Sequence, residues 1–504
     1  MKKANQHTPN STRRYVIRCC LLGSLFTFAL AFLLVCFWYA LNYDLEFKEL
    51  LYTMTSPLKG SAHQTAFLIM RDCIPLGAVL VAVFVYVAIK CYGDDVSAWK
   101  KRTRRWALLA TCLFTAASLI IGSVAMRVPS YLLSKLQKTT IYEQYYVDPE
   151  SVKIEANGEA KNLIYIYVES LETTYTATAD GGRQKQNYMP RLTALAQENL
   201  SFSNRTDGKL GGFQTPLGSG WTMSALLATT SGIPYSFPIG DNTSEKKEHF
   251  AEGLTTLGDV LEDKGYRQMF LCGSDIEFAG RDLYFSQHGN YELFDINAAR
   301  EAGYIAEDYH NGFWGFEDHI LFDIAKSEVL KLAEGDQPFN MTLLTVDTHN
   351  TGGYFCDECQ SLYGDSEDEM LANIIDCTDR QVTEFVAWCQ AQEFYEDTVI
   401  VITGDHPRMD DLLVQNIEYD DRVIYNCFLN AVPNTEGATT GRVFTSFDIF
   451  PTTLAAMGFE IEGNRLGLGV NLFSTEQTLA EQIGYKKFEK EINKHSDFYL
   501  REFR

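Results

Sequence analysis

Acidic residues and histidines follow three short apolar runs of this sequence. The runs are NLIYIYV, FNMTLLTV and DTVIVIT, and the residues that follow them include Glu169, Asp347, His349, Asp405 and His406. If the runs are parallel strands, their carboxyl ends meet at one edge of a sheet, which is where ligands bind in such folds. Carboxylates together with imidazoles suit a divalent ion such as Mn²⁺, Mg²⁺ or Zn²⁺. The combination therefore predicts a metal site, although a single acid after a strand is usually solvated or caps a helix.

A glycine-rich segment, residues 208–234, holds a candidate nucleophile. It reads GKLGGFQTPLGSGWTMSALLATTSGIP, and Thr222 lies where the loop runs into a helical pattern. Free backbone N–H groups and the helix dipole favour an anion at such a point. A hydroxyl held there beside a metal is a candidate nucleophile, whereas an isolated threonine at a helix start more often only caps the helix. The residues alone leave both interpretations open.

The elements that must position these side chains have an α/β pattern. A fourth run, RQMFLC (267–272), is also short, continuous and apolar, which is typical of strands buried on both faces. Helical patterns lie between the runs: one begins near Pro190, one ends at Gly265, and one has Thr378 as a candidate cap. This alternation predicts a mainly parallel central sheet with helices on both faces.

Three long apolar runs precede residue 127. They cover about 16–43, 73–92 and 106–126, and each is long enough to cross a hydrocarbon core of roughly 30 Å. A cleaved signal peptide is the competing interpretation of the first run. That run is too long, however, it lacks a small-residue cleavage site, and two more runs follow it. We therefore expect three transmembrane helices.

Basic residues are concentrated on alternate sides of these runs. Five lie at or before the start of the first run and five lie between the second and third, whereas the loop between the first and second carries few, such as Lys48 and Lys59. Short loops rich in Lys and Arg stay in the cytoplasm. The sequence thus predicts a multi-pass protein of the cytoplasmic (inner) membrane whose large domain is extracytoplasmic.

The charge changes sign where the apolar runs end. Residues 1–126 hold 14 Lys and Arg against 6 Asp and Glu, and the remaining residues hold 29 against 60. An acidic domain lacks the basic footprint of a nucleic-acid-binding protein, so we expect no nucleic-acid partner. It also disfavours broad adhesion to anionic lipid, so any lipid recognition is expected to be local.

Six of the 12 cysteines lie after the apolar runs. They are Cys272, Cys356, Cys359, Cys377, Cys389 and Cys427. Four of them fall within residues 356–389, and an oxidising exterior would permit disulfides there. A zinc or redox interpretation of the Cys-x-x-Cys pair needs a second pair of ligands or a thioredoxin-like context, and the sequence indicates neither. We predict disulfide bonding within this cluster, with the connectivity open.

Six motifs occur in an order that resembles the phosphoglycerol transferases. They are YVES, SGWTMSALLATTSGIP, FAGRDLYFSQHG, WGFEDH, TVDTHNTGGYFCDEC and ITGDH. These enzymes belong to the sulfatase-like branch of the alkaline phosphatase superfamily. The match is of the phosphoglycerol transferase I type, with lipoteichoic acid synthase as a related enzyme, and it covers roughly residues 140–470. The resemblance implies an alkaline phosphatase/sulfatase-like fold for the extracytoplasmic domain.

The apolar runs and the resemblance together predict four parts of the chain. They are a membrane anchor (1–126), a connector (127–160), a sulfatase-like catalytic domain (161–475) and a C-terminal extension (476–504).

The resemblance also implies roles for individual residues. The positions that match the ligands of one Mn²⁺ or Mg²⁺ are Glu169, Thr222, Asp405 and His406. Thr222 matches the nucleophile as well, and His349 and Arg281 match residues that contact the phosphoglycerol group. His349 would either transfer protons or donate a hydrogen bond to a phosphate oxygen. The aromatic residue that lipoteichoic acid synthase carries just before the arginine has no clear counterpart in FAGR (278–281).

The implied function is transfer of phosphoglycerol from phosphatidylglycerol in the membrane to a hydroxyl of an acceptor glycan or glycopolymer, through a phosphoglycerol-threonine intermediate. The alternatives are a glycerol-phosphate polymerase of the lipoteichoic acid synthase type, a phosphoethanolamine transferase, and a non-catalytic sensor of lipid headgroups. Sulfatase activity is disfavoured because the nearest match to a Cys-x-Pro-x-Arg motif, at Cys73, lies in an apolar run and lacks the arginine. A two-metal phosphatase is disfavoured because no histidine follows His406 until His495.

Overall fold

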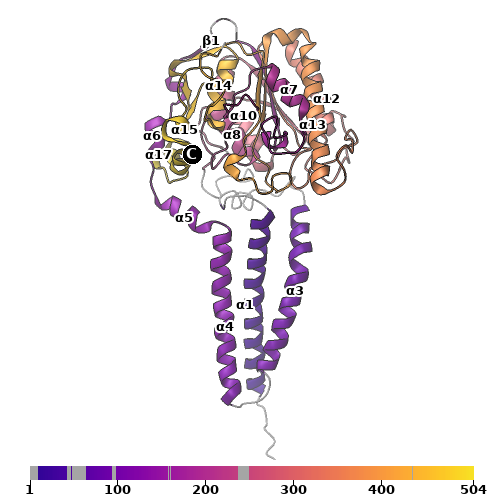
Figure 1. Cartoon of the computed structure of the whole chain (residues 1–504), viewed down its shortest axis with the longest axis vertical. Helices are drawn as coiled ribbons and strands as arrows, with labels where there is room; N and C mark the ends of the chain where they lie inside the picture. The colour runs from indigo at the N-terminus through magenta and orange to yellow at the C-terminus, as the bar shows by residue number, and fades with distance from the viewer. Residues whose placement is uncertain are drawn as a thin grey trace, which may run out of the picture. The chain divides into compact units, whose positions relative to one another are not determined.

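The computed structural model describes residues 9–42, 47, 64–92, 98–156, 158, 160–236, 249–433 and 435–503. It comprises two compact units, which are drawn in Figure 1. Most residues up to Leu132 form the first unit, called the anchor here, and the residues from Leu133 onward form most of the second, called the globular unit. The predicted loop with Lys48 and Lys59 lies outside the described residues.

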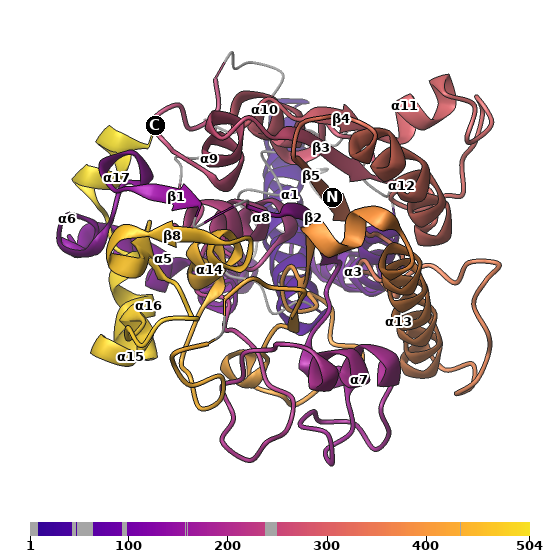
Figure 2. The same ribbon diagram turned by 90° about the horizontal axis from the view of Figure 1, so that it is seen from above.

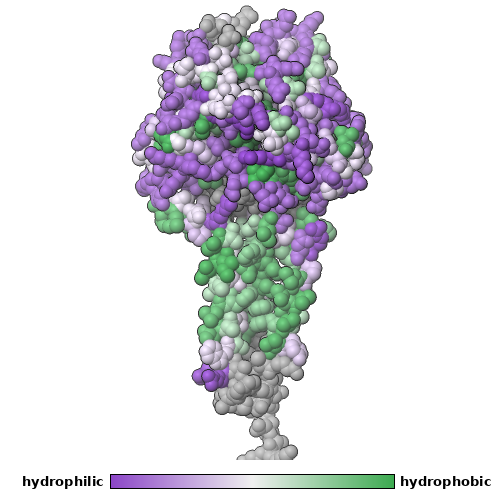
Figure 3. Space-filling model, in the orientation of Figure 1, coloured by the Kyte–Doolittle hydropathy of each residue, from purple (hydrophilic) through white to green (hydrophobic). Residues whose placement is uncertain are grey.

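Within the described residues, the anchor contains three long helices, α1 (Pro9–Asn42), α3 (Gln64–Tyr92) and α4 (Ala98–Ala125). Each contains a stretch that is long and apolar enough to cross a membrane: Cys20–Asn42, Phe67–Val87 and Arg105–Ala125. Apolar side chains cover the surface of these helices (Figure 3). The second stretch begins at Phe67 rather than near residue 73, because α3 continues through Pro75 as one helix.

The globular unit alternates strands and helices. Its strands are β1 (Ile154–Ala156), β2 (Asn162–Val168), β3 (Arg267–Cys272), β4 (Glu292–Phe294), β5 (Phe339–Leu344), β6 (Thr398–Gly404), β7 (Asn426–Leu429), β8 (Phe459–Ile461), β9 (Arg465–Leu466) and β10 (Gly469–Val470). Its helices are α6 (Ile141–Tyr145), α7 (Pro190–Glu198), α8 (Thr222–Ser231), α9 (Leu257–Asp263), α10 (Arg281–Gln287), α11 (Ile296–Glu301), α12 (Asp318–Ala333), α13 (Glu367–Gln390), α14 (Ile449–Ala456), α15 (Leu479–Ile483), α16 (Tyr485–Ile492) and α17 (Asp497–Glu502). The helix α5 (Val128–Leu136) spans the boundary between the two units.

Six strands form the central sheet in the order β4-β3-β5-β2-β6-β7. All neighbouring pairs are parallel except β6 and β7, which are antiparallel. The predicted mainly parallel sheet is therefore confirmed. The four strands predicted from apolar runs are β2, β3, β5 and β6, and their residues are almost all buried because helices cover both faces.

Alternate residues of β2 face two separate hydrophobic cores. Leu163, Tyr165 and Tyr167 belong to a core that includes residues of α8, α9, α10 and α14. Ile164 and Ile166 belong to the other core, which includes residues of α7, α12 and α13. Figure 2 shows α12 and α13 on one side of the sheet and α8 and α14 on the other. This packing fixes the sheet, since complete burial of each such side chain contributes about 1.5–3 kcal/mol.

The first residues of three helices can be compared with the predicted helix starts and caps. The helix α7 begins at Pro190, as predicted, and α9 begins after the cap Thr256, whose hydroxyl accepts a hydrogen bond from the Asp259 N–H. The predicted cap at Thr378 is wrong, because this residue lies inside α13. That helix begins about three turns earlier, where Ser366 and Glu369 form a reciprocal capping box.

The segments at the two ends of the globular unit pack on each other. The Tyr142 ring in α6 contacts the Tyr499 ring in α17 edge to face, with 5.4 Å between centroids. The Tyr499 hydroxyl also donates to the Pro234 carbonyl over 2.7 Å. The C-terminal helices thus contribute to the same core as the glycine-rich segment.

Candidate active site

The register of the sheet places Glu169 beside Asp405. In the parallel pair of β2 and β6, Val168 lies opposite Gly404, so the next residue of each strand carries a carboxylate at the same edge. A side chain at Gly404 would collide with the backbone, because a Cβ there would lie 2.0 Å from the Leu171 carbonyl oxygen. Glycine therefore allows the two chain segments to approach closely just before the acidic residue.

Three potential metal ligands meet at this edge. Glu169, Asp405 and His406 each offer one ligand atom, and these atoms all lie within 4.8 Å of one another. The His406 Nε2 atom is 3.5 Å from Glu169 Oε1 and 3.3 Å from Asp405 Oδ2. All three side chains are buried, with at most 2% of Glu169 exposed. The structure thus brings together three of the four predicted ligands in one enclosed cluster.

Neighbouring groups orient these ligands toward a common centre. Asp405 Oδ1 accepts hydrogen bonds from the backbone N–H groups of Ser170 and His406, both over 2.8 Å. The His406 Nδ1 atom is 2.9 Å from the Pro407 carbonyl oxygen. Because Nδ1 must donate to that carbonyl, Nε2 of the neutral ring would present its lone pair to the cluster. The Ser170 hydroxyl donates to Glu169 Oε1 over 2.7 Å.

The electrostatics of the cluster fit a bound cation. Burial and the neighbouring Glu169 carboxylate raise the pKa of Asp405 to about 7. Burial also acts to raise the pKa of Glu169, but the charges of His349 and His406 and the Ser170 hydroxyl bring it below its ordinary value. Asp405 Oδ2 is buried and has no hydrogen-bond partner within the described residues. A divalent cation would satisfy this oxygen, and two carboxylates with one imidazole suit Mn²⁺, Mg²⁺ or Zn²⁺.

The hydroxyl of Thr222 faces this cluster. Thr222 is the first residue of α8, and its Oγ1 is 3.4 Å from Glu169 Oε2 and 3.3 Å from His406 Nε2. The N-cap of this helix is Trp221, whose N–H donates to the Ser224 hydroxyl over 3.1 Å. The side chain of Thr222 thus contacts the ligand cluster and, among the described residues, makes no cap hydrogen bond. The distance to Glu169 exceeds that of a usual O–H···O hydrogen bond, which is roughly 2.7–2.8 Å.

His349 lies at the carboxyl end of the neighbouring strand β5. Its side chain is half-buried, and the Trp314 ring packs on it with 4.3 Å between centroids. The Nδ1 atom is 2.5 Å from the Asn350 carbonyl oxygen, so Nδ1 carries the proton and Nε2 can accept one. Burial lowers the pKa of His349, which favours the neutral ring. When the His349 ring is protonated, its positive charge lowers the pKa of Glu169.

Arg281 is held at the start of α10 by the loop that precedes it. Its Nη2 donates to the Ser274 hydroxyl over 3.0 Å and to the Asp275 carbonyl over 2.6 Å. Its Nε donates to the Phe278 carbonyl over 3.1 Å, and the guanidinium lies 5.6 Å from the Phe278 ring. Within the described residues, no direct hydrogen bond joins Arg281 to Glu169 or Thr222.

Two aromatic rings connect Arg281 with His349. The Phe278 ring contacts the Trp314 ring with 5.4 Å between centroids, and Trp314 in turn packs on His349. Aromatic side chains therefore stand beside the arginine, although none directly precedes it in the chain. Phe278 belongs to the quoted FAGR motif and Trp314 to the quoted WGFEDH motif, more than thirty residues further along the chain, so the fold brings the two motifs together.

Buried ion pairs beneath the cluster were not predicted from the sequence. The Arg408 side chain is fully buried, and its Nη2 donates to Asp410 Oδ2 over 2.6 Å. Its Nη1 donates to the Thr348 carbonyl over 2.7 Å, which links the segment after β6 to the segment with His349. Arg422 pairs with the buried Glu172 and donates to the Arg408 carbonyl over 2.7 Å. The only indication of these ion pairs in the sequence was the charged residues after the GDH motif, and charged residues in a loop are usually solvated.

Comparison with known proteins places these motifs in a family. The sulfatase family model matches residues 161–459, which is more than half of the chain. A protein named phosphoglycerol transferase I from Xanthomonas axonopodis pv. citri is 32% identical over 282 residues, which cover 55% of this chain and 38% of that protein. A protein of the same name from Salmonella choleraesuis is 28% identical over 448 residues, or 86% of this chain and 53% of that protein. The chain thus spans about half or less of the length of these relatives.

A solved structure described as the lipoteichoic acid synthase LtaP from Listeria monocytogenes is also similar. The alignment has 19% identity and a TM-score of 0.49, and it covers 64% of this chain and 79% of that one. The match of the family model to residues 161–459 includes the sheet and all three clustered ligands. The chain therefore belongs to the sulfatase family.

Proposed function

We propose that this protein transfers phosphoglycerol from phosphatidylglycerol to a hydroxyl of an acceptor glycan or glycopolymer. The observation that carries the proposal is the Thr222 hydroxyl, which lies 3.3–3.4 Å from two of three clustered ligand groups at the start of a helix. A sulfatase-family fold and two relatives named phosphoglycerol transferase I support it.

Glu169, Asp405 and His406 would hold one Mn²⁺ or Mg²⁺, with the Thr222 oxygen beside it. When bound, such an ion supplies positive charge that lowers the pKa of a nearby hydroxyl and stabilises phosphate oxygens. The first turn of α8 adds backbone N–H groups and the positive end of the helix dipole. The cluster thus favours both an alkoxide on Thr222 and an anionic phosphodiester.

The reaction would proceed in two displacements. The Thr222 oxygen attacks phosphorus, the bond from phosphorus to the diacylglycerol oxygen breaks, and phosphoglycerol stays on the threonine. The proton released from Thr222 is balanced by the proton that diacylglycerol takes up as it leaves. In the second step, the acceptor hydroxyl attacks the same phosphorus, loses its proton, and releases Thr222 as the free hydroxyl.

His349 and Arg281 would act on the phosphoglycerol group. With its Nδ1 proton held by the Asn350 carbonyl, His349 can accept a proton at Nε2 from the acceptor hydroxyl, or donate one to the leaving group once it is protonated. A simple hydrogen bond from His349 to a phosphate oxygen is the other role. Arg281 would bind phosphate oxygens through N–H donors that its loop contacts leave available.

Two other transferases would use the same cluster. A glycerol-phosphate polymerase of the lipoteichoic acid synthase type differs only in its acceptor, and a phosphoethanolamine transferase differs in its donor headgroup. A sensor that only binds headgroups is the least favoured, because binding alone does not require a hydroxyl beside a ligand cluster. The donor and acceptor therefore need direct measurement.

The test uses the full chain in detergent with Mn²⁺ and headgroup-labelled phosphatidylglycerol or phosphatidylethanolamine. Without acceptor, we expect diacylglycerol from phosphatidylglycerol and a phosphoglycerol adduct on the peptide that contains Thr222. With candidate glycans, the label should pass to the acceptor. An adduct on another side chain would exclude the threonine intermediate, and faster reaction of phosphatidylethanolamine would replace the proposed donor.

A further inference from the structure

A second cluster of ligand-type side chains lies away from the three ligands described above. The Cys356 sulfur is 3.4 Å from the Cys359 sulfur and 3.9 Å from the Cys377 sulfur, and all three sulfurs lie within 4.8 Å of one another. Within the described residues, the six cysteines of the globular unit are all free thiols, so the predicted disulfides are not formed.

The spacing of the sulfurs is that of a tetrahedral metal site. Zinc binds cysteine sulfur at about 2.3 Å, which places two sulfurs of a tetrahedron roughly 3.8 Å apart. A disulfide would require one pair at about 2.05 Å and would leave the third sulfur outside the bond. The three cysteines converge on one point instead of forming a pair, which favours a shared ion.

His319 supplies a candidate fourth ligand. This residue is the second of α12, and its imidazole interacts with the Cys356 thiol. Its Nδ1 atom is buried and has no hydrogen-bond partner in the described part of the chain. A buried ring nitrogen without a partner costs free energy unless something binds it, and a metal ion would do so.

Donors around the sulfurs suit thiolates. The Gln381 side-chain amide donates to Cys377 over 3.4 Å and approaches Cys356 at 3.9 Å. The Arg380 guanidinium lies 3.6 Å from the Cys377 sulfur. Zinc with three thiolates and one neutral imidazole carries one net negative charge, which Arg380 would offset. Such hydrogen bonds to ligating sulfurs are typical of metal sites.

We infer that Cys356, Cys359, Cys377 and His319 bind one Zn²⁺ in a closed structural site. Soft thiolates select zinc, whereas the Glu169 cluster has no sulfur ligand and suits harder ions. The Cys-x-x-Cys motif alone did not indicate a second pair of ligands. In the proposed site, His319 from α12 and Cys377 from α13 form this pair.

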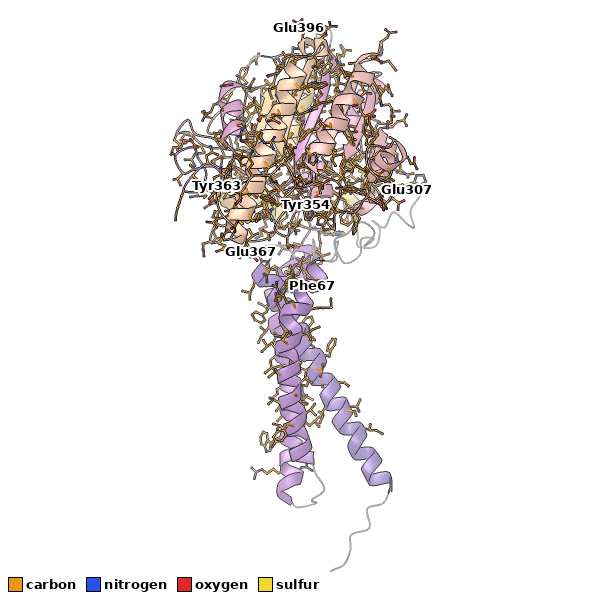
Figure 4. All side chains as sticks on the ribbon, turned by 90° about the vertical axis from the view of Figure 1, so that its right-hand side faces the viewer. Phe67, Glu307, Tyr354, Tyr363, Glu367 and Glu396 are labelled. Atoms are coloured by element: carbon orange, nitrogen blue, oxygen red, sulfur yellow. The ribbon has the colours of Figure 1, made fainter. Side chains whose placement is uncertain are left out.

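The site would fasten the segment that carries His349. Asp318, which precedes His319, accepts hydrogen bonds from the N–H groups of Val346 and Asp347. Zinc would thus join the start of α12, the segment after β5 and the middle of α13. Tyr354 in this segment and Glu367 at the start of α13 lie at one end of the globular unit, and Glu396 lies at the other (Figure 4).

The experiment measures metal and thiols on the full chain, purified in detergent without reducing agent. We expect about one zinc per chain that survives mild chelation, and all six cysteines of the globular unit alkylated after denaturation with chelator. Replacing zinc by Co²⁺ should give the thiolate-to-cobalt absorption of a tetrahedral site. The variants Cys377→Ser and His319→Gln should lose at least nine-tenths of the zinc.

Two control variants test whether the zinc is held by these four residues. Cys389→Ser alters another buried cysteine of α13 and should keep both the zinc and the cobalt spectrum. Asp405→Asn, in the other cluster, should also keep them. Because Cys377→Ser could fail to fold, the milder His319→Gln is compared by cobalt spectrum as well. Unalkylated cysteines released only by reductant, or unchanged zinc in both ligand variants, would overturn the inference.

Discussion

At the scale of single residues, the position of Thr222 distinguishes a nucleophile from a cap. The hydroxyl that caps the first turn of α8 belongs to Ser224, which accepts from the Trp221 N–H and donates to its carbonyl. The Thr222 hydroxyl instead contacts Glu169 and His406. The helix-start hydrogen bonds and the contacts with the potential ligands thus belong to two different residues of the same helical turn, which supports the nucleophile role proposed for Thr222.

Replacement of Thr222 tests this division. Thr222→Ala should reduce transfer by more than about 10³-fold, since the attacking oxygen is removed, while unfolding free energy changes by less than ~1 kcal/mol. Thr222→Ser keeps a hydroxyl and should retain a measurable part of the rate. The matched control Ser224→Ala should cost about 1 kcal/mol and keep most of the transfer. Rates with labelled phosphatidylglycerol and denaturant unfolding give both quantities, and an active Thr222→Ala protein would contradict the assignment.

Removal of a single ligand should mimic removal of the metal. Asp405→Asn removes a negative charge and the Oδ2 acceptor but keeps the side-chain shape, so we expect loss of Mn²⁺ binding and at least about 10²-fold slower transfer. Chelation of the wild type should have the same effect, and added Mn²⁺ should restore only the wild type. Asp365→Asn, at an exposed acid, serves as control. Two Mn²⁺ ions per active chain, or full activity of Asp405→Asn, would exclude the proposed single Mn²⁺ site.

The sequence predicted Glu169, Asp405 and His406 as neighbours because they follow buried strands. Register then decides their spacing, and apolar runs such as NLIYIYV make that register predictable. Trp314 and His319 could not be placed in this way, because each meets its partners through packing of segments that are distant in the chain. The same holds for the proposed zinc site, because Cys-x-x-Cys carried no indication of a histidine on another helix.

At the scale of elements, threonine hydroxyls tie the two central strands together at the site. The Glu169 N–H donates to the Thr345 hydroxyl over 3.0 Å, and the Thr348 hydroxyl donates to the Glu169 carbonyl over 2.6 Å. Arg408, in the segment that follows β6, donates a hydrogen bond to the Thr348 carbonyl. The ends of β2, β5 and β6 are therefore cross-linked by buried hydrogen bonds, so the cluster is fixed before any ligand binds.

Replacement of Trp314 tests whether its indole ring positions His349. Its Nε1 donates to the Asn350 carbonyl over 3.2 Å, the same oxygen that faces His349 Nδ1. Trp314→Ala removes the ring and this donor, so we expect about 10–10²-fold slower transfer from a misplaced imidazole, with metal content unchanged. Trp314→Phe keeps a ring and should lose less. The control is Trp388→Phe, which alters a ring that contacts Phe385 in the core formed with α12 and α13. Equal rates for Trp314→Ala and wild type would show that the ring does not position His349.

At the scale of the whole molecule, charge and apolar surface separate the two units. The anchor helices carry exposed apolar side chains along their length, whereas polar residues cover the globular unit (Figure 3). The net charge is positive before residue 127 and strongly negative after it. Such an acidic surface is repelled by anionic lipid, so the proposed recognition of phosphatidylglycerol would depend on the local cation and Arg281 rather than on general attraction.

The orientation of the anchor decides whether the proposed chemistry reaches extracytoplasmic acceptors. Ten basic residues lie at the start of the first run and between the second and third, so we expect both regions in the cytoplasm and the globular unit outside. Reporter fusions after Lys59 and at the C-terminus should both be external, and a fusion within 93–97 should be cytoplasmic. Neutralising the basic residues between the second and third helices should weaken this orientation, whereas replacing Lys48 and Lys59 should not. A cytoplasmic reporter at the C-terminus would place the Thr222 cluster on the wrong side for an envelope glycan, and the proposed acceptor class would have to be abandoned even if transfer from phosphatidylglycerol were measured.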